Sequence, residues 1–378
     1  MVQFREDSYS YSILKNIALS GEFPYHSLSM LDGNERIIKR TLLNMRKEGY
    51  VTLVGNGQMK SIRLTKKAFP VLNEMGKGYY EHYMFMSGNH KFRGGKDSDR
   101  IVWRNHRLAE IMVILQYIGA KICIGDKPIL SMNKNPGSIP HDDIFFYNSR
   151  EMKNADIEQR YKTEFTRVMG ALFSPGGVYA VYNTNKGLMK WNRQGEGKAQ
   201  VLIEDIVSCN YSGSYEQLNN AIMFGKDIDT AKKILESNGG KRDANDFEML
   251  SFDNTYENIY YIPLDEHGIY QLNLISQNGW KDAIRYSIFP EEYLKTERLS
   301  IDCDAFDGEN KFILSFLDGN IGRLKRFKEV SYDSSRSTYE VVCFDWQKEM
   351  VSEYMGTNAT LKEITEEMLS NMISQTFS

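Results

Sequence analysis

Residues 35–64, which read ERIIKRTLLNMRKEGYVTLVGNGQMKSIRL, decide the fold of the first part of the chain. Apolar residues recur at helical spacing through the first half of this stretch, and Gly49 is suited to end a helix. The period then changes to two, over residues 51–54 before a Gly-rich turn and over residues 62–64 after it. The pattern predicts a helix from about Glu35 to Glu48, followed by a two-stranded hairpin.

The flanking segments complete a recognisable order of elements. Ser8 is a good N-cap for a helix that ends near Leu19, and a short second helix is expected around Leu28. After the hairpin, Thr65 can cap a last helix that reaches about Lys77. Three helices, a hairpin and a further helix are the order of a winged helix-turn-helix, a module that places one helix in the major groove of DNA.

The central helix of this module has two chemically different faces. We expect its apolar face to be buried through Ile37, Ile38, Leu42 and Met45. The opposite face and the hairpin carry basic and amide side chains, which can reach phosphates and base edges. The residues predicted to contact DNA are Arg36, Lys39, Arg40, Asn44, Lys47, Lys60, Arg63, Lys66 and Lys67.

The distribution of charge favours the same interpretation. Residues 1–67 contain eleven Lys and Arg against six Asp and Glu, a net charge of +5, whereas the whole chain carries −3. A basic segment on an acidic chain is typical of a local phosphate-binding surface. The alternative is a module that docks onto another protein and whose basic face is simply solvated.

Length and composition indicate more than one domain. A chain of 378 residues is usually two or three domains. Residues 88–99, GNHKFRGGKDSD, are polar and Gly-rich and read as a linker. We therefore predict a winged helix over residues 1–77, a linker over residues 78–99 and an α/β domain over residues 100–378.

Several classes of protein are disfavoured by what the sequence lacks. The four cysteines form no CxxC pair, which argues against a Cys-based zinc site and against a disulfide framework. No run of 18 apolar residues and no apolar signal-peptide core are present, so we predict a cytoplasmic protein without a membrane partner. The motifs GxxxxGK[ST], GxSxG and HExxH are also absent.

The second part of the chain alternates strands and helices, which predicts an α/β body with a mixed sheet. The clearest strand signal is a hairpin over residues 168–182 with a turn at Ser174–Gly177. Further strands are expected at Ile129–Ser131 and Tyr339–Phe344, and a final helix is expected over Leu361–Ile373.

A helix near Trp103 carries the sequence RNHRLAE at residues 104–110. A winged helix, an R-x-H-R-L-A-E helix and an α/β body together resemble the replication-relaxation family of Gram-positive plasmids and integrative elements. His106 stands where that family's helix carries its recurrent His. The resemblance implies a DNA-binding protein of a mobile element, acting in plasmid replication, in relaxation for conjugation, or in their regulation. Taken alone, His106 is more typical of a cap or a hydrogen-bonded packing residue.

The resemblance and the module together indicate the partners. Double-stranded DNA is the first of them. Many winged-helix proteins pair on palindromes, so a homodimer is a second candidate, and replication or transfer proteins are a third.

Three carboxylates in the second part are candidate catalytic residues: Asp302, Asp304 and Asp318. We expect the first two on one strand and the third at the end of the next, with Glu309 and Lys311 near the turn. Acidic residues on adjacent strands followed by E-x-K resemble the metal site of restriction-endonuclease-like folds, where carboxylates hold Mg²⁺ and a Lys steers the attacking water.

This resemblance is incomplete, and alternatives stay open. Phe316 stands two positions before Asp318, where an acidic residue is expected. The alternative is a β-hairpin with an acidic tip, followed by a basic cluster at Arg323–Lys328. The leading function is therefore sequence-specific binding of duplex DNA without enzymatic activity. The rivals are a nuclease or nickase, for which alone Mg²⁺ would be the cofactor, and a protein-docking adaptor.

Overall fold

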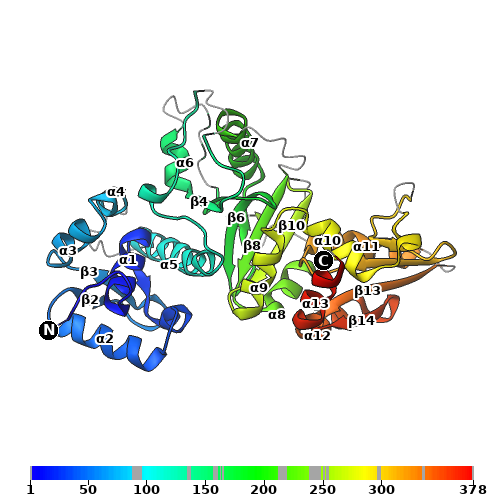
Figure 1. Ribbon diagram of the computed structural model, residues 1–378, viewed down its shortest axis with the longest axis horizontal. Helices are drawn as coiled ribbons and strands as arrows, with labels where there is room; N and C mark the ends of the chain where they lie inside the picture. Colours follow the sequence, from blue (N-terminus) through cyan, green and yellow to red (C-terminus); the bar gives the residue numbers. More distant parts are fainter. Residues whose placement is uncertain are drawn as a thin grey trace. The chain divides into compact units, whose positions relative to one another are not determined.

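The computed structural model describes residues 2–86, 96–133, 138–155, 161, 163, 166–211, 219–237, 248–249, 252, 255–295, 299–333 and 337–376. The chain is mixed α/β and forms two compact units, Met1–Ile129 and Leu130–Ser378 (Figure 1). Among the described residues, no helix combines the length and the apolar character needed to cross a membrane.

The first unit consists of short helices around a small sheet. Its elements are α1 (Tyr9–Ser20), β1 (Phe23–Pro24), η1 (Tyr25–Met30), α2 (Glu35–Lys47), β2 (Val51–Val54), η2 (Gly57–Met59), β3 (Ser61–Leu64), α3 (Ala68–Met75), α4 (Tyr79–Met86), α5 (Lys96–Tyr117) and η3 (Ile124–Asp126). Ser8 caps α1 by accepting a hydrogen bond from the backbone N–H of Tyr11, and Asn34 caps α2. The expected helices and hairpin are confirmed, with the short second helix in 3₁₀ form.

The sheet of the first unit has one strand of the hairpin, β3, at its centre. The strand order is β1-β3-β2, and both pairings are antiparallel. Ile62 of β3 lies opposite Leu53 on one side and Phe23 on the other, and its side chain is completely buried. The two-residue strand β1 was not predicted, because Phe23–Pro24 is too short to show a period.

Helix α2 is amphipathic, but its apolar face is narrower than predicted. Ile38, Leu42 and Met45 are buried, whereas Ile37 is 49% exposed. The expectation that Ile37 belongs to the core is therefore wrong. Helical spacing explains this result, since Ile38, Leu42 and Met45 follow one another at four and three residues and Ile37 lies beside that row.

Helix α5 belongs to the first unit, although the sequence analysis assigned it to the second. The division was predicted near residue 100, whereas the compact units divide after Ile129. Helix α5 packs against α1, β1 and η1, so it completes the core of the first unit. Of the predicted linker, residues 87–95 lie outside the described residues, and Asn89, His90, Lys91 and Arg93 are among them.

Buried polar contacts attach α5 to the hairpin. The carboxylate of Glu22 accepts hydrogen bonds from Arg63 Nε of β3 at 2.9 Å and from Asn105 Nδ2 of α5 at 3.1 Å. His106 Nε2 lies 2.8 Å from the hydroxyl of Ser61. A buried charge is stable only when it is paired and hydrogen-bonded. These contacts therefore fix α5 and β3 in one arrangement.

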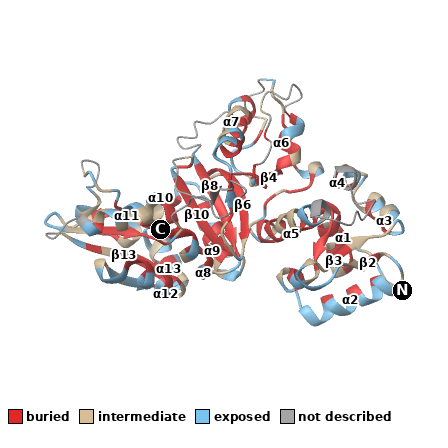
Figure 2. Cartoon of the chain, turned by 180° about the vertical axis from the view of Figure 1, so that it is seen from behind, coloured by how far each residue is buried: buried red, intermediate tan, exposed pale blue. Residues whose placement is uncertain are grey.

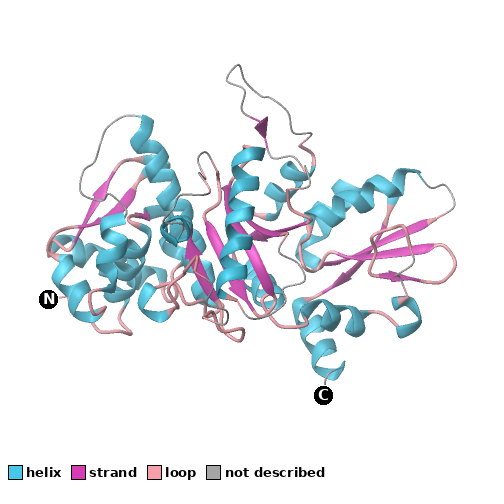
Figure 3. Ribbon diagram, turned by 90° about the horizontal axis from the view of Figure 1, so that it is seen from above, coloured by secondary structure: helices cyan, strands magenta, loops and turns pink. Residues whose placement is uncertain are grey.

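The second unit contains two larger sheets, both flanked by helices (Figure 3). Its elements are β4 (Phe145–Asn148), α6 (Ser149–Ala155), β5 (Gly170–Ser174), β6 (Gly177–Asn185), β7 (Lys190–Trp191), α7 (Arg193–Asn210), β8 (Asn220–Gly225), α8 (Ile228–Leu235), β9 (Glu248–Met249), β10 (Asn258–Pro263), α9 (Glu266–Ile275), α10 (Trp280–Ile288), η4 (Glu291–Leu294), β11 (Ala305–Phe306), β12 (Lys311–Ser315), α11 (Ile321–Asp333), β13 (Thr338–Phe344), η5 (Asp345–Gln347), α12 (Lys348–Met355), η6 (Gly356–Asn358), β14 (Thr360–Ile364) and α13 (Glu366–Thr376).

Both sheets are mixed, as predicted. The five-stranded sheet has the order β10-β8-β6-β5-β4, with β10, β8 and β6 parallel and the predicted β5–β6 hairpin antiparallel. The four-stranded sheet has the order β11-β12-β13-β14, with β11 antiparallel and the other pairings parallel. Strands β5, β6, β8 and β10 are almost entirely buried, as their apolar runs require (Figure 2).

Three expectations for the second part of the chain are wrong. Ile129–Ser131 forms no strand. Thr360–Ile364, which the prediction placed mostly in a helix, pairs with β13 as strand β14, and the last helix begins only at Glu366. Asp302 and Asp304 precede the short strand β11 rather than lying on a strand.

A backbone contact joins the two sheets of the second unit. The N–H of Tyr261 in β10 donates to the carbonyl of Gly319, which follows β12, at 2.8 Å. Gly319 has φ +69°, and a Cβ there would lie only 2.6 Å from the carbonyl oxygen of Tyr261. Glycine is therefore required at this close approach.

We predict that Glu22→Ala destabilises the first unit strongly. The Glu22 side chain is 2% exposed, and its removal leaves the Arg63 guanidinium and the Asn105 amide without their carboxylate. Breaking a buried ion pair costs about 3–5 kcal/mol. Urea unfolding followed by circular dichroism measures the loss.

Lys39→Ala, which removes an exposed ion pair with Glu35, is the control and should leave the unfolding midpoint nearly unchanged. Equal effects of the two substitutions would contradict the assigned role of Glu22.

Candidate functional site

A polar cavity of about 290 Å³ lies in the second unit, and it brings the three candidate carboxylates together. Asp302, Asp304 and Asp318 all line it, although the last two are 14 positions apart in the sequence. Most of the remaining lining comes from β10, from α10, from the end of β12 and from the first turns of α11. The sequence analysis identified the three carboxylates, but it did not predict that α10 lines the cavity.

Backbone contacts hold Asp304 and Asp318 in place. Asp304 extends the β11–β12 pairing, since its N–H donates to the carbonyl of Ile313 at 2.8 Å, and its carboxylate accepts the N–H of Ser315 at 2.7 Å. Asp318 accepts the N–H of Asn320 at 2.9 Å, and the amide oxygen of Asn320 accepts the N–H of Arg323 in the first turn of α11. The segment that follows β12 therefore positions both the Asp318 carboxylate and the first turn of α11.

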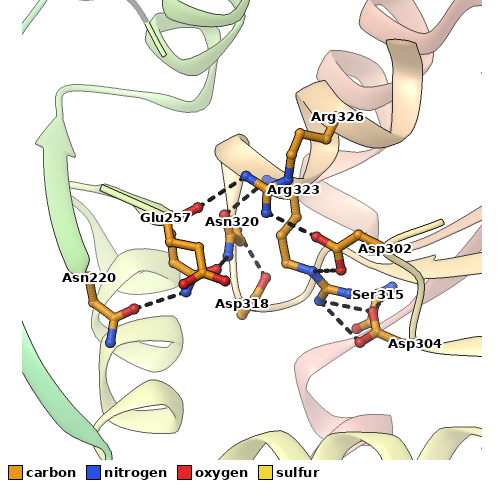
Figure 4. Close-up of polar contacts among 10 residues, drawn as sticks. Asn220, Glu257, Asp302, Asp304, Ser315, Asp318, Asn320, Arg323 and Arg326 are labelled. Carbon is orange, nitrogen blue, oxygen red and sulfur yellow. Dashed lines mark hydrogen bonds and ion pairs between the residues drawn. The ribbon is translucent and has the colours of Figure 1, made fainter. Parts of the chain in front are cut away.

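Arg323 lies between two of the carboxylates. Its Nε is 3.0 Å from Asp302 Oδ1, and its Nη1 is 3.1 Å from Asp304 Oδ1 (Figure 4). Arg326 adds a contact of 2.9 Å to the other oxygen of Asp302. The side chains of Arg323 and Asp304 are only 16% and 11% exposed, so their contact is shielded from water, whereas Asp302 is 42% exposed. Arg323 and Arg326 were predicted only as members of a basic cluster.

Burial and charge shift the protonation of these groups in different directions. Burial opposes ionisation of Asp302, but Arg323 and Arg326 together hold the pKa of this carboxyl below its ordinary value. Burial raises the pKa of Asp318 to about 6, against the opposing effect of Arg323. Burial also lowers the pKa of Lys281 on α10, while Asp318 acts in the opposite direction. Asp318, with its pKa raised to about 6, therefore titrates close to neutral pH.

The cavity wall also contains a hydroxyl without a partner. Ser315 is 7% exposed, and its Oγ makes no hydrogen bond within the described part of the chain. Its backbone N–H is held by Asp304. A buried hydroxyl without a partner costs free energy unless water or a ligand satisfies it.

The cavity residues do not fit the magnesium site that the sequence suggested at Asp302, Asp304 and Asp318. Asp302 and Asp304 bind the guanidinium of Arg323, which supplies the positive charge at this position. Within the described residues, no three acidic, His or Cys side chains are grouped so that they could hold a metal. Glu309 and Lys311 do not line the cavity, and Lys311 pairs with Glu340 at 2.6 Å.

The second candidate site is the exposed face of α2 in the first unit. Helix α2 turns its exposed side away from the unit (Figure 2). Seven of the nine residues predicted to contact DNA are exposed: Arg36, Lys39, Arg40, Asn44, Lys47, Lys66 and Lys67. Arg46, which the prediction omitted, is exposed on the same helix. Lys39 pairs with Glu35 one turn earlier, at 2.6 Å.

The other two predicted residues are held by the fold. Arg63 pairs with the buried Glu22, so its guanidinium is directed into the unit. The ammonium of Lys60 lies 3.9 Å from the centroid of the Tyr25 ring, a cation–π contact, and Lys60 is half-buried. The sequence pattern of the hairpin does not show which basic side chains are held by the fold. It therefore could not distinguish Arg63 and Lys60 from the exposed Lys66 and Lys67.

His106 is a packing residue. It is 1% exposed and bonds to Ser61 through Nε2. Burial lowers the pKa of its imidazole to about 4. The ring is therefore neutral at physiological pH and connects α5 to β3.

Comparisons with protein-family models, curated proteins and solved structures gave no match. The resemblance to the replication-relaxation family therefore stays a prediction from the sequence.

We predict a distinct pH signature for Asp318. Its pKa is raised by burial, so the folded state holds the proton more tightly than the unfolded state does. The stabilisation from this proton is complete below about pH 3.8 and is lost as the pH rises through about 6. Asp318→Asn removes the titrating group. Relative to wild type, the free energy of unfolding of the variant should rise by about 2 kcal/mol between pH 4 and pH 7.

Urea unfolding at several pH values measures this difference. Glu309→Gln, at the exposed turn before β12, is the control and should follow the wild-type pH dependence. A difference between Asp318→Asn and wild type that does not change with pH would contradict the assignment.

Proposed function

We propose that the chain binds duplex DNA through its first unit, as a sequence-specific reader in which α2 enters the major groove. The observation that carries this proposal is the exposed basic face of α2. The supporting architecture is the order α1, β1, η1, α2, β2, β3 with the sheet order β1-β3-β2, which fits a winged helix-turn-helix. In that fold α2 is the recognition helix and the β2–β3 hairpin is the wing.

The geometry of α2 suits this role. Arg36, Arg40 and Lys47 share one side of the helix, because their spacing is four and seven residues. Ile38, Leu42 and Met45 occupy the opposite side and anchor the helix to the unit. The exposed side can therefore meet a negatively charged groove without disturbing the core. Arg side chains can bind guanine edges or phosphates, and Asn44 can bind adenine.

The wing would contribute fewer contacts than the sequence suggested. Arg63 neutralises Glu22 inside the unit, so we assign it a positioning role. Lys66 and Lys67 are exposed after β3 and are the better candidates for phosphate contacts. Lys67 also donates to the carbonyl of Glu48 at 2.7 Å, which orients it next to the end of α2.

The biological setting of the proposal comes from the resemblance in sequence. The chain would serve a mobile element in plasmid replication, in relaxation for transfer, or in their regulation. A second copy of the chain and replication or transfer proteins are its candidate partners. Dimers of such modules bind two half-sites about one helical turn apart, so a palindromic target would accompany a dimer.

A second candidate function is cleavage of DNA in the cavity of the second unit. Its supporting observation is that Asp302, Asp304 and Asp318 line one cavity with Lys281. The pairing of Arg323 with two of these carboxylates stands against it. Incubation with supercoiled DNA and Mg²⁺ separates the two functions. Nicking that is lost in Asp304→Asn and Asp318→Asn would favour the nuclease.

We predict that Arg36→Ala combined with Arg40→Ala lowers the affinity for duplex DNA at least about tenfold, because each Arg supplies a phosphate or base contact. The slope of log K against log salt should become shallower by about 2 if both contacts are to phosphates. Fluorescence anisotropy over a salt series measures both quantities.

The matched control is Arg5→Ala combined with Lys77→Ala, which removes the same charge from exposed positions outside α2 and the wing. If the control weakens DNA binding as much as the Arg36 and Arg40 double variant does, nonspecific electrostatic attraction, rather than recognition by α2, would explain the binding. An absence of binding by the wild type at low salt would favour the docking adaptor.

A further inference from the structure

Leu43 is an apolar residue within the basic face of α2. It is 49% exposed. The residues three and four positions before it are Arg40 and Lys39, and those three and four positions after it are Arg46 and Lys47. In a helix these four positions surround Leu43 on the surface, and all four are basic and exposed.

This environment restricts what can cover Leu43. Lys39 is paired with Glu35, so its charge is partly compensated. The four basic side chains together still repel a basic surface and attract an anionic one. A partner must therefore offer negative charge around a small apolar group. The major groove of duplex DNA provides both, because phosphates border it and the C5 methyl of thymine projects into it.

We propose that Leu43 contacts the methyl group of a thymine and thereby selects an A·T pair at one position of the target. This inference rests on the proposed DNA binding and adds the chemical feature that the helix reads. Arg36 and Arg40 fix the helix in the groove through phosphates or guanine edges. Leu43 then lies on the same side of α2, one turn after Arg40, where it faces the base edges.

Ile37 provides an internal comparison. It is also 49% exposed, but it lies next to the buried Ile38 and one turn before the half-buried Thr41. It therefore borders the core rather than the centre of the basic face. We expect Ile37 to contribute little to base recognition.

The test begins with selection of preferred sequences from a random duplex pool by the full-length protein. Each thymine of the selected duplex is then replaced singly by uracil, which removes only the methyl group. Loss of one buried methyl should lower wild-type affinity about fourfold at one thymine per bound protomer, with little effect at the others.

Leu43→Ala should bind the thymine and uracil duplexes equally well. Alanine is the best helix former, so the variant keeps α2 intact, and circular dichroism verifies this. Ile37→Ala is the matched control, because it removes an equally exposed apolar side chain from the same helix. It should keep the wild-type preference for thymine over uracil at the sensitive position.

Four outcomes would overturn the inference. Sequence-selective binding that is insensitive to uracil at every thymine would refute the methyl contact and leave DNA binding standing. A uracil effect that persists in Leu43→Ala would assign the contact to another residue. Sedimentation that shows a wild-type dimer lost in Leu43→Ala would assign the face to a second copy of the chain. Absence of any duplex binding would instead refute the proposed function itself, and with it this inference.

Discussion

The first unit depends on one buried carboxylate. Glu22 directly precedes β1, and its carboxylate is the shared hydrogen-bond partner of Arg63 on β3 and Asn105 on α5. Without it, a guanidinium and an amide would be left in an apolar interior, at a cost greater than most single contacts can offset. The carboxylate therefore fixes the hairpin and α5 against α1. Helix α2 packs its buried side against α1, β2 and η1 of the same unit.

The second unit uses ionic pairing in a different way. Arg323 joins Asp302 and Asp304, which come from the segment before β11, to the first turn of α11. Gly319 and Asn320 bring the same region against β10. The cavity therefore lies where the two sheets meet, and two of its carboxylates, Asp302 and Asp304, are paired with Arg323, while Arg326 also pairs with Asp302. This charge pairing is the physical reason why we propose DNA recognition in the first unit rather than here.

Local patterns predicted much of the fold. The α2 helix, its Asn34 cap, the β2–β3 hairpin and the β5–β6 hairpin follow from spacing and turn residues within short stretches. The predictions were wrong where contacts between residues distant in the sequence determine the structure. Thr360–Ile364 has no strong strand signal and becomes β14 only because β13 offers its edge. Helix α5 joins the first unit through Asn105 and His106, whose partners lie far away in the sequence.

The candidate site was predictable to a similar extent. The three carboxylates were identified because they are close in sequence and flank predicted strands. Lys281 could not be associated with them, since α10 is distant from them in the sequence and reaches the cavity through tertiary packing, which includes Trp280 against Tyr260 of β10. On α2, helical spacing identified the basic face but misplaced Ile37.

Hydrogen–deuterium exchange with and without duplex DNA measures whether the first unit is the DNA-binding part of the chain. If it is, peptides that cover Glu35–Lys47 and the residues following β3 become protected when DNA is added. Protection confined to the second unit would contradict DNA recognition by α2.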